Sequence, residues 1–247
     1  MTQRSLALAC LLALGALGAT AQHPDRFEEI REFTLPADRA VIAVDGGHNG
    51  GASVQGWDRD EILVRAKIQI SRSRVADPAA LAQEIGIELA DTIHAIGPRR
   101  GDYSVSFEIF APHHSNFELN AQNGGVHVSD VTGAMNLLTL NGGLHLARVG
   151  GDVTGRATNG GLHVELGGDR WEGDKLDVVT TNGGVRLYVP EDYSAELETG
   201  TVNGGIDIDF PVTISGRFSK HFTTTLGDGG APVRVRTTNG GVRIRRT

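Results

Sequence analysis

The tripeptide Asn-Gly-Gly recurs seven times, and this repeat constrains the fold more than any other feature of the chain. The copies begin at Asn49, Asn123, Asn141, Asn159, Asn182, Asn203 and Asn239. In the last six, an apolar, a variable and a second apolar residue follow, as in QNGGVHV, LNGGLHL and TNGGVRI. Successive Asn residues of these six are separated by 18, 18, 23, 21 and 36 residues. Self-similarity at a short period is the signature of a repeat architecture.

The chemistry of the motif predicts a corner followed by a short strand. Asn and Gly tolerate positive φ, so Asn-Gly forms a tight reversal at little steric cost. We assign the second Gly to a close approach by the backbone of a neighbouring coil. The apolar-x-apolar triplet has period two, so Val126 and Val128 should point inward while His127 points outward.

Two all-β architectures fit these units. In a meander or sandwich, each Asn-Gly would close an antiparallel hairpin. In a β-solenoid, each unit is one coil, and equivalent residues stack at the strand spacing of ~4.8 Å. We favour the solenoid, because the period is near constant and Gly133 aligns with Gly151 one period later. Stacked Asn side chains would then form an amide ladder, and residues 170–174 would form a loop on one face.

The N-terminal flank differs from the repeat. Residues 41–44, 52–54, 62–70, 85–89 and 103–110 alternate as strands, and Asp77-Pro78 is a start signal for one short helix over 77–84. We expect residues 22–120 to be a strand region with a short helix that caps the open edge of the stack. Residues 121–247 form the repeat solenoid, continuous with that region as one elongated domain.

The repeated units and several flanking segments resemble the bacterial putative-adhesin family of exported β-strand-repeat proteins, a family of largely unknown function. The flanking segments are Val54-Gln55-Gly56-Trp57-Asp58, the helix after Asp77, Val189-Pro190-Glu191-Asp192-Tyr193 and Leu226-Gly227-Asp228-Gly229-Gly230. The resemblance covers roughly residues 28–247. It implies a fold, and it supplies no binding or catalytic residues.

Residues 1–21 are typical of a signal peptide. Arg4 provides the positive region, residues 6–17 are apolar and small, and Ala19-Thr20-Ala21 is an A-x-A cleavage pattern. A lipoprotein signal acylated at Cys10 is the alternative, although Ala7-Leu8-Ala9 is a poor lipobox. The apolar run is too short to span a bilayer. We therefore predict an exported protein (periplasmic, cell-surface or secreted) with no integral membrane segment after cleavage.

Charge and cysteine content exclude several functions. The chain carries a formal charge of −7, and loss of Arg4 makes the mature form −8. This acidic balance argues against a nucleic-acid partner, which would require a basic stripe. The only cysteine lies in the signal peptide, so the mature form has no disulfide and no Cys-based metal site. No cofactor is expected.

Three histidines carry the sharpest local signal. His127, His145 and His163 occupy the same outward position in consecutive units, with Glu165 two residues beyond the last. Stacked imidazoles at strand spacing could share Zn²⁺ or Cu²⁺. The alternative is a solvated row that binds nothing and continues as Arg186, Asp207 and Arg243. We favour this second interpretation, because no second shell is evident.

The C-terminus is basic. Arg234, Arg236, Arg243 and Arg245 alternate with apolar residues. This face could bind a partner, such as an anionic glycan, a membrane headgroup or a protein. The alternative, which we favour, is that outward charge protects the open edge of a terminal strand.

No catalytic signature accompanies the repeat. G-x-S-x-G, H-E-x-x-H, Walker and dinucleotide motifs are missing from the sequence. We predict a non-catalytic envelope or cell-surface protein that binds or scaffolds an unknown protein or glycan partner. The alternatives are a periplasmic metal- or ligand-binding module that uses the histidine row, and a carbohydrate-active β-helix enzyme.

Overall fold

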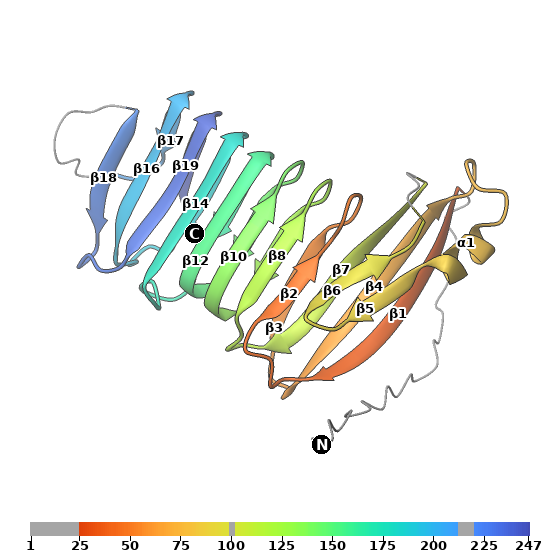
Figure 1. The fold of residues 1–247 in the computed structure, drawn as a ribbon. Coiled ribbons are helices and arrows are strands. Elements are labelled where there is room, and N and C mark those ends of the chain that lie inside the picture. The colour runs from red at the N-terminus through yellow and green to blue at the C-terminus, as the bar shows by residue number, and fades with distance from the viewer. Residues whose placement is uncertain (1–24, 99–101, 212–219) are drawn as a thin grey trace, which may run out of the picture.

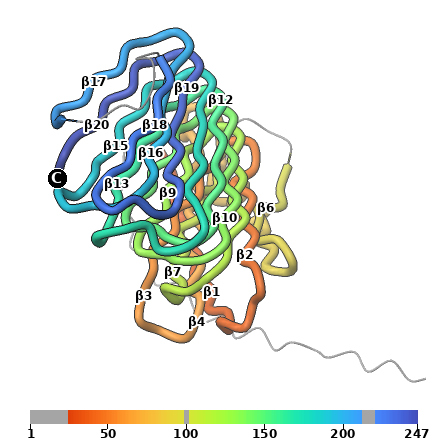
Figure 2. The backbone as a smooth tube through the Cα atoms, turned by 90° about the vertical axis from the view of Figure 1, so that its left-hand side faces the viewer, coloured from red at the N-terminus to blue at the C-terminus, as the bar shows by residue number. Residues whose placement is uncertain are grey.

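A computed structural model describes residues 25–98, 102–211 and 220–247, so the predicted signal peptide lies outside the described residues. The described chain is all-β apart from one short helix, and it forms two ten-stranded sheets. The strands lie side by side along an elongated stack (Figure 1). In Figure 2 the stack is viewed along its length, so that successive coils lie one behind another.

We name the sheet that contains the strands after Asn-Gly-Gly sheet A. Its spatial order is β1 (Arg26–Pro36), β4 (Glu61–Ser71), β7 (Tyr103–Pro112), β3 (Ala52–Trp57), β9 (Val126–Ser129), β11 (Leu144–Ala147), β13 (Leu162–Glu165), β15 (Val185–Val189), β20 (Val242–Arg246) and β17 (Ile206–Ile208). Strands β3 to β17 of this order pair in parallel, whereas β1, β4 and β7 pair antiparallel at one end.

Sheet B contains the strands that precede Asn-Gly-Gly. Its order is β18 (His221–Leu226), β16 (Ala195–Asn203), β19 (Pro232–Asn239), β14 (Lys175–Asn182), β12 (Gly150–Asn159), β10 (Thr132–Thr139), β8 (Phe117–Ala121), β2 (Ile42–Asp45), β6 (Thr92–Ile96) and β5 (Gly86–Leu89). Each repeat therefore contributes one strand to each sheet, and the Asn-Gly-Gly corner joins them. Parallel pairing of equivalent strands excludes the meander for the repeat and gives a solenoid-like stack.

The N-terminal flank contains the predicted helix and strands, together with β1, β6 and β8, which were not predicted from the sequence. The predicted helix is α1 (Pro78–Glu84), in which the Asp77 side chain accepts a hydrogen bond from the Ala80 amide at 3.0 Å. Leu81 and Ala82 are buried. Strands β2 and β3 already form a coil with Asn49 at its corner, so both sheets run without a break from this flank into the repeat. None of the described helices is long and apolar enough to cross a membrane.

The core lies between the two sheets. Side chains alternate along each strand, as in β4, where Ile62, Val64, Ala66, Ile68 and Ile70 are all at most 1% exposed. The inward residues of the repeats form the same kind of layer, and burying each large apolar side chain contributes roughly 1.5–3 kcal/mol. The predicted loop at 170–174 lies between β13 and β14, and it places Trp171 in this core with its indole N–H donating to the Gly151 carbonyl at 3.0 Å.

The predicted amide ladder is present at the Asn-Gly-Gly corner. The Asn141 side-chain amide donates to Asn123 Oδ1 at 2.7 Å, and the ladder continues through Asn159, Asn182, Asn239 and Asn203 at 2.8–2.9 Å. Threonines two residues before four of these Asn residues donate to the first-Gly carbonyl of the adjacent coil. These bonds are Thr139 to Gly124, Thr180 to Gly160, Thr201 to Gly240 and Thr237 to Gly183.

Our assignment of roles to the two glycines is wrong. Positive φ among the described residues is confined to Asp130, Arg148 and seven glycines outside the Asn-Gly-Gly triplets. The first Gly is the one that needs a missing Cβ: a Cβ on Gly142 would lie 2.1 Å from the Gly124 carbonyl oxygen. At the second Gly the space is looser but varies: the nearest atom to an added Cβ lies at 2.6 Å for Gly51, 2.8 Å for Gly143 and 3.1 Å for Gly161. The triplet is therefore glycine-rich because the coils stack closely at the corner.

The C-terminal coil does not end the stack. Strand β19 lies between β14 and β16, and β20 lies between β15 and β17. The C-terminus accordingly lies within the stack in Figure 1. The edge-protection interpretation of Arg234, Arg236, Arg243 and Arg245 is therefore wrong, because both strands that carry them have neighbours on each side.

Candidate functional site

The histidine row lies on the outer face of sheet A in the predicted register. His127 and His163 flank His145 as register partners on β9, β13 and β11. The ring centroids of His127 and His145 are 4.8 Å apart, and those of His145 and His163 are 4.7 Å apart with nearly parallel planes. Among the residues that the structure places, no three His, Cys, Asp or Glu side chains form a group that could hold a metal ion.

The environment of His127 and His145 favours their neutral imidazoles. Desolvation lowers the pKa of His127. The pKa of His145 is lowered first by desolvation and then by the charges of His127, His163 and Arg186. A folded state that resists protonation loses stability when the pH falls below the ordinary histidine pKa.

We therefore expect acidification from pH 7.5 to 5.5 to lower the free energy of unfolding of the wild type. The loss begins near pH 6.5, where the unfolded chain starts to bind protons that His127 and His145 exclude in the fold. The double variant His127→Gln, His145→Gln should lose less stability over the same interval. Urea unfolding at the two pH values measures both losses, and equal losses would contradict the assignment.

Beyond the histidines, the row crosses two arginines and reaches an aspartate. The spatial order is His163, Arg186, Arg243 and Asp207, because β20 lies between β15 and β17. The predicted order, with Asp207 before Arg243, followed the chain and is wrong. The inserted coil thus places two guanidinium groups on neighbouring strands.

A groove of about 650 Å³ runs beside this row. Its lining contains the second glycines of five triplets, which we call the glycine floor, and the row residues of the same strands. The lining residues are Gly143, Gly161, Gly184, Gly205 and Gly241 with His145, His163, Arg186, Asp207 and Arg243, and with the intervening apolar residues of the same strands. Each of these glycines precedes the outward residue of the row by two positions. The glycines and the row residues therefore face the same side of the sheet. The groove is therefore a direct product of the repeat.

Most of the predicted basic surface is paired within the fold. Arg234 donates to Glu198 at 2.8 Å, and Arg236 bridges Glu198 and Asp177 at 3.4 and 2.9 Å. Arg245 forms an ion pair with Asp207. The hydrogen bond from Arg245 lowers the pKa of Asp207, and the charges of Arg245 and Arg243 lower it further.

Arg243 and Arg186 differ from these three arginines. Within the described part of the chain, no carboxylate lies within ion-pair distance of either guanidinium, and both side chains are exposed. Sequence reasoning singled out Arg243 but treated Arg186 only as part of a solvated row. The groove brings the two together with His145 and His163.

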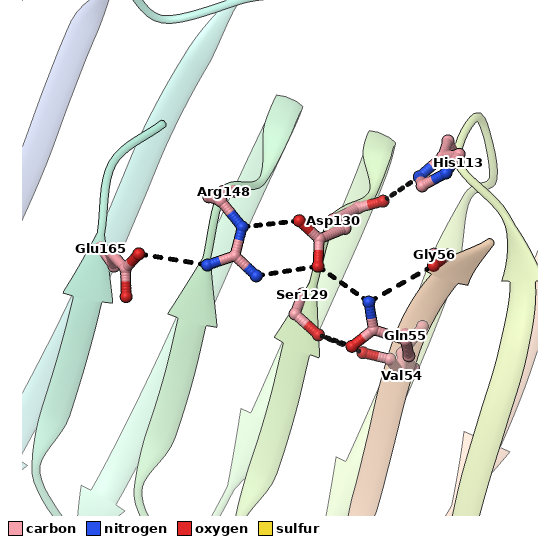
Figure 3. Close-up of polar contacts among 8 residues, drawn as sticks. All are labelled: Val54, Gln55, Gly56, His113, Ser129, Asp130, Arg148 and Glu165. Carbon is pink, nitrogen blue, oxygen red and sulfur yellow. Dashed lines mark hydrogen bonds and ion pairs between the residues drawn. The ribbon is translucent and has the colours of Figure 1, made fainter. Parts of the chain in front are cut away.

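Glu165 is not available to the histidine row. Its carboxylate accepts a hydrogen bond from Arg148 at 3.1 Å, and Arg148 makes a two-point contact with Asp130 at 2.6 and 2.8 Å (Figure 3). Asp130 also accepts from the Gln55 amide at 2.8 Å. The hydrogen bond from Arg148 is the main cause that lowers the pKa of Asp130.

This polar cluster stabilises the corner opposite Asn-Gly-Gly. Asp130 and Arg148 have φ of 57° and 51°, a backbone region that costs non-glycine residues energy. Sequence reasoning missed the pair. The available signal was opposite charges 18 residues apart, which is one full repeat.

Comparisons with known proteins bear on the family. No curated protein matches the chain. Solved structures that are similar include a putative cell adhesion protein from Clostridium sporogenes, with 12% identity, coverage of 90% of this chain and 100% of that chain, and a TM-score of 0.49. A putative adhesin from Bacteroides fragilis has 11% identity, coverage of 90% and 97%, and a TM-score of 0.33.

A third similar structure is a putative lipid binding protein from Parabacteroides distasonis, with 11% identity, coverage of 89% and 96%, and a TM-score of 0.32. The family model described as Toastrack DUF4097 matches residues 70–245, which is more than half of the chain. The protein therefore belongs to the Toastrack DUF4097 family.

Proposed function

We propose that this protein is an exported, non-catalytic binding module of the cell envelope, and that its ligand occupies the groove of sheet A. The groove itself carries the proposal, because its volume of about 650 Å³ is in the range of ligand sites. Repeat stacks present extended surfaces that suit binding along the stack. Export rests on residues 1–21, and N-terminal sequencing of the exported protein should find Gln22 as the first residue.

The second glycines that line the groove offer a test that does not depend on the ligand's charge. Gly205 lines the end of the groove at β17, and a Cβ there would meet no atom within 4 Å, so this position tolerates a side chain at the groove end. We expect Gly205→Trp to fold normally and to weaken every ligand of the wild type about tenfold or more, because the indole occupies the space that the ligand needs.

Gly86→Trp is the matched control. Gly86 lies in β5 at the other end of the stack, and its Cβ would have its nearest neighbour at 3.9 Å. Both variants and the wild type are compared on an array of neutral and anionic polysaccharides and envelope proteins. Ligands that bind Gly205→Trp as tightly as the wild type would place the binding surface elsewhere.

A second, narrower candidate is that His127, His145 and His163 bind Zn²⁺ or Cu²⁺ after their side chains rotate, because the stacked arrangement does not itself group three metal ligands. The ring spacing of 4.7–4.8 Å is the observation that favours it. Glu165 would have to leave Arg148 to take part. Equilibrium dialysis with Zn²⁺ tests this candidate, and equal uptake by the wild type and a triple His→Ala variant would exclude it.

A further inference from the structure

Two unpaired arginines occupy the middle of the groove. Arg186 on β15 and Arg243 on β20 are register partners of adjacent parallel strands, so their backbones are about 4.8 Å apart. Like charges directly opposite each other on a sheet destabilise it. Arg245 on the same strand as Arg243, and Arg234 and Arg236 on sheet B, all have carboxylate partners. An anion from outside the chain is the partner that this pair lacks.

The one carboxylate in the groove is near enough for the charge of Arg243 to lower its pKa, but it forms no ion pair with Arg243. Asp207 follows Arg243 in the row, but its carboxylate is held by Arg245 from the neighbouring column. On the other side of the pair lies His163, whose ring stacks on His145. A ligand that follows the row therefore meets imidazoles and then two guanidinium groups, which form hydrogen bonds with carboxylate or sulfate oxygens at two points.

The shape of the groove indicates a linear ligand. It crosses β11, β13, β15, β20 and β17, so its long direction follows the stack. The glycine floor has no side chains that would divide it into separate pockets. A continuous floor suits a linear polymer that extends beyond the arginine pair in both directions.

Two other anionic partners fit less well. An acidic peptide would add most simply to a free sheet edge. Strands β13, β15 and β20 have strands on both sides, and β17, the end strand of sheet A, offers an edge of only 3 residues. A lipid surface would require exposed apolar side chains beside the cations. The large exposed apolar residues among those described, which are Ile30, Val41, Ile96, Leu138, Leu140 and Val202, do not line the groove.

We infer that the groove binds a linear polysaccharide bearing carboxylate or sulfate groups, with Arg186 and Arg243 contacting its anionic groups and His163 lying beside them. This inference rests on the proposed function, since it names the ligand class of the same groove. The net charge of −7 makes the pair a local exception on an acidic protein. Binding should therefore depend on these two residues more than on the overall field.

The test measures binding of the protein to immobilised polygalacturonate, dextran sulfate and neutral dextran by biolayer interferometry. The double variant Arg186→Gln, Arg243→Gln should weaken binding of the anionic polymers about tenfold or more. The double variant Arg74→Gln, Arg156→Gln removes the same charge from exposed positions outside the groove. It should stay within about twofold of the wild type, because exposed distant charges are screened.

The outcomes separate this inference from the proposed function. Equal weakening by the two double variants, or no binding of either anionic polymer, would overturn the inference. Binding to vesicles of phosphatidylglycerol and phosphatidylcholine without binding to the polymers would assign the cations to a membrane instead. If neutral dextran binds and only Gly205→Trp abolishes that binding, the groove remains the binding surface and the anionic ligand is wrong. If Gly205→Trp leaves all binding intact, both proposals fail.

Discussion

Gly160→Ala should lower the free energy of unfolding by at least about 3 kcal/mol, because overpacking against rigid backbone lies at the costly end of such substitutions. The added Cβ would lie 2.1 Å from the Gly142 carbonyl oxygen of the adjacent coil. That oxygen is backbone and cannot rotate away. The two coils must separate at their corner, which also strains the hydrogen bond of 2.9 Å that the Asn159 side-chain amide donates to Asn141 Oδ1.

Gly205→Ala is the matched control, because its Cβ would meet nothing within 4 Å. There we expect unchanged or slightly higher stability, since Ala restricts the unfolded chain more than Gly does. Urea unfolding of the two variants measures the difference. Equal effects would mean that the glycines serve backbone conformation rather than close stacking.

Deletion of residues 232–247 should unfold the end of the stack rather than trim it. The deletion removes β19 and β20, whose buried residues Val233, Val235, Val242 and Ile244 are at most 1% exposed. At roughly 1.5–3 kcal/mol for each side chain, the lost burial is on the order of 6–12 kcal/mol. Strands β16 and β17 would also lose their parallel partners.

Hydrogen exchange reports the result by segment. Amides of residues 195–208 and 221–226 should lose protection in the deletion variant, although these residues are still present. Removal of Thr247 alone, which lies beyond β20, should leave protection unchanged. Retained protection of 195–208 in the deletion variant would contradict the inserted position of the C-terminal coil.

The repeat made much of the architecture predictable. Gly133 and Gly151 pair as the 18-residue period requires, and His127, His145 and His163 stack in register. The reason is physical: a period-two triplet after a fixed corner leaves one register in which every apolar residue faces inward. The Asn ladder follows from the same register.

The order of the coils was not predictable from the motif. Each unit presents the same Asn ladder and the same strand pair, so a coil can stack beside any other coil. Charge complementarity was the available signal: Arg234 lies beside Glu198, and Arg236 lies between Glu198 and Asp177. The insertion created the pairing of Arg186 with Arg243, so the repeat motif alone could not predict this part of the candidate site.

The roles of the two glycines also could not be assigned from sequence. Positive φ and close backbone approach both require Gly, and the motif looks the same in either case. The structure distinguishes the two requirements by the distance from an added Cβ to its nearest atom. The consequence for function is that the second glycines, which have looser surroundings, are the ones that form the groove floor.

The most direct test of the groove as the binding surface is NMR of the arginine side chains during titration with polygalacturonate. The Nε–Hε resonances of Arg186 and Arg243 should shift most, while those of Arg74 and Arg156 stay in place. Arg245, which is held by Asp207, should shift less than Arg243. Shifts that are largest at Arg74 or Arg156, or equal at all exposed arginines, would contradict the account.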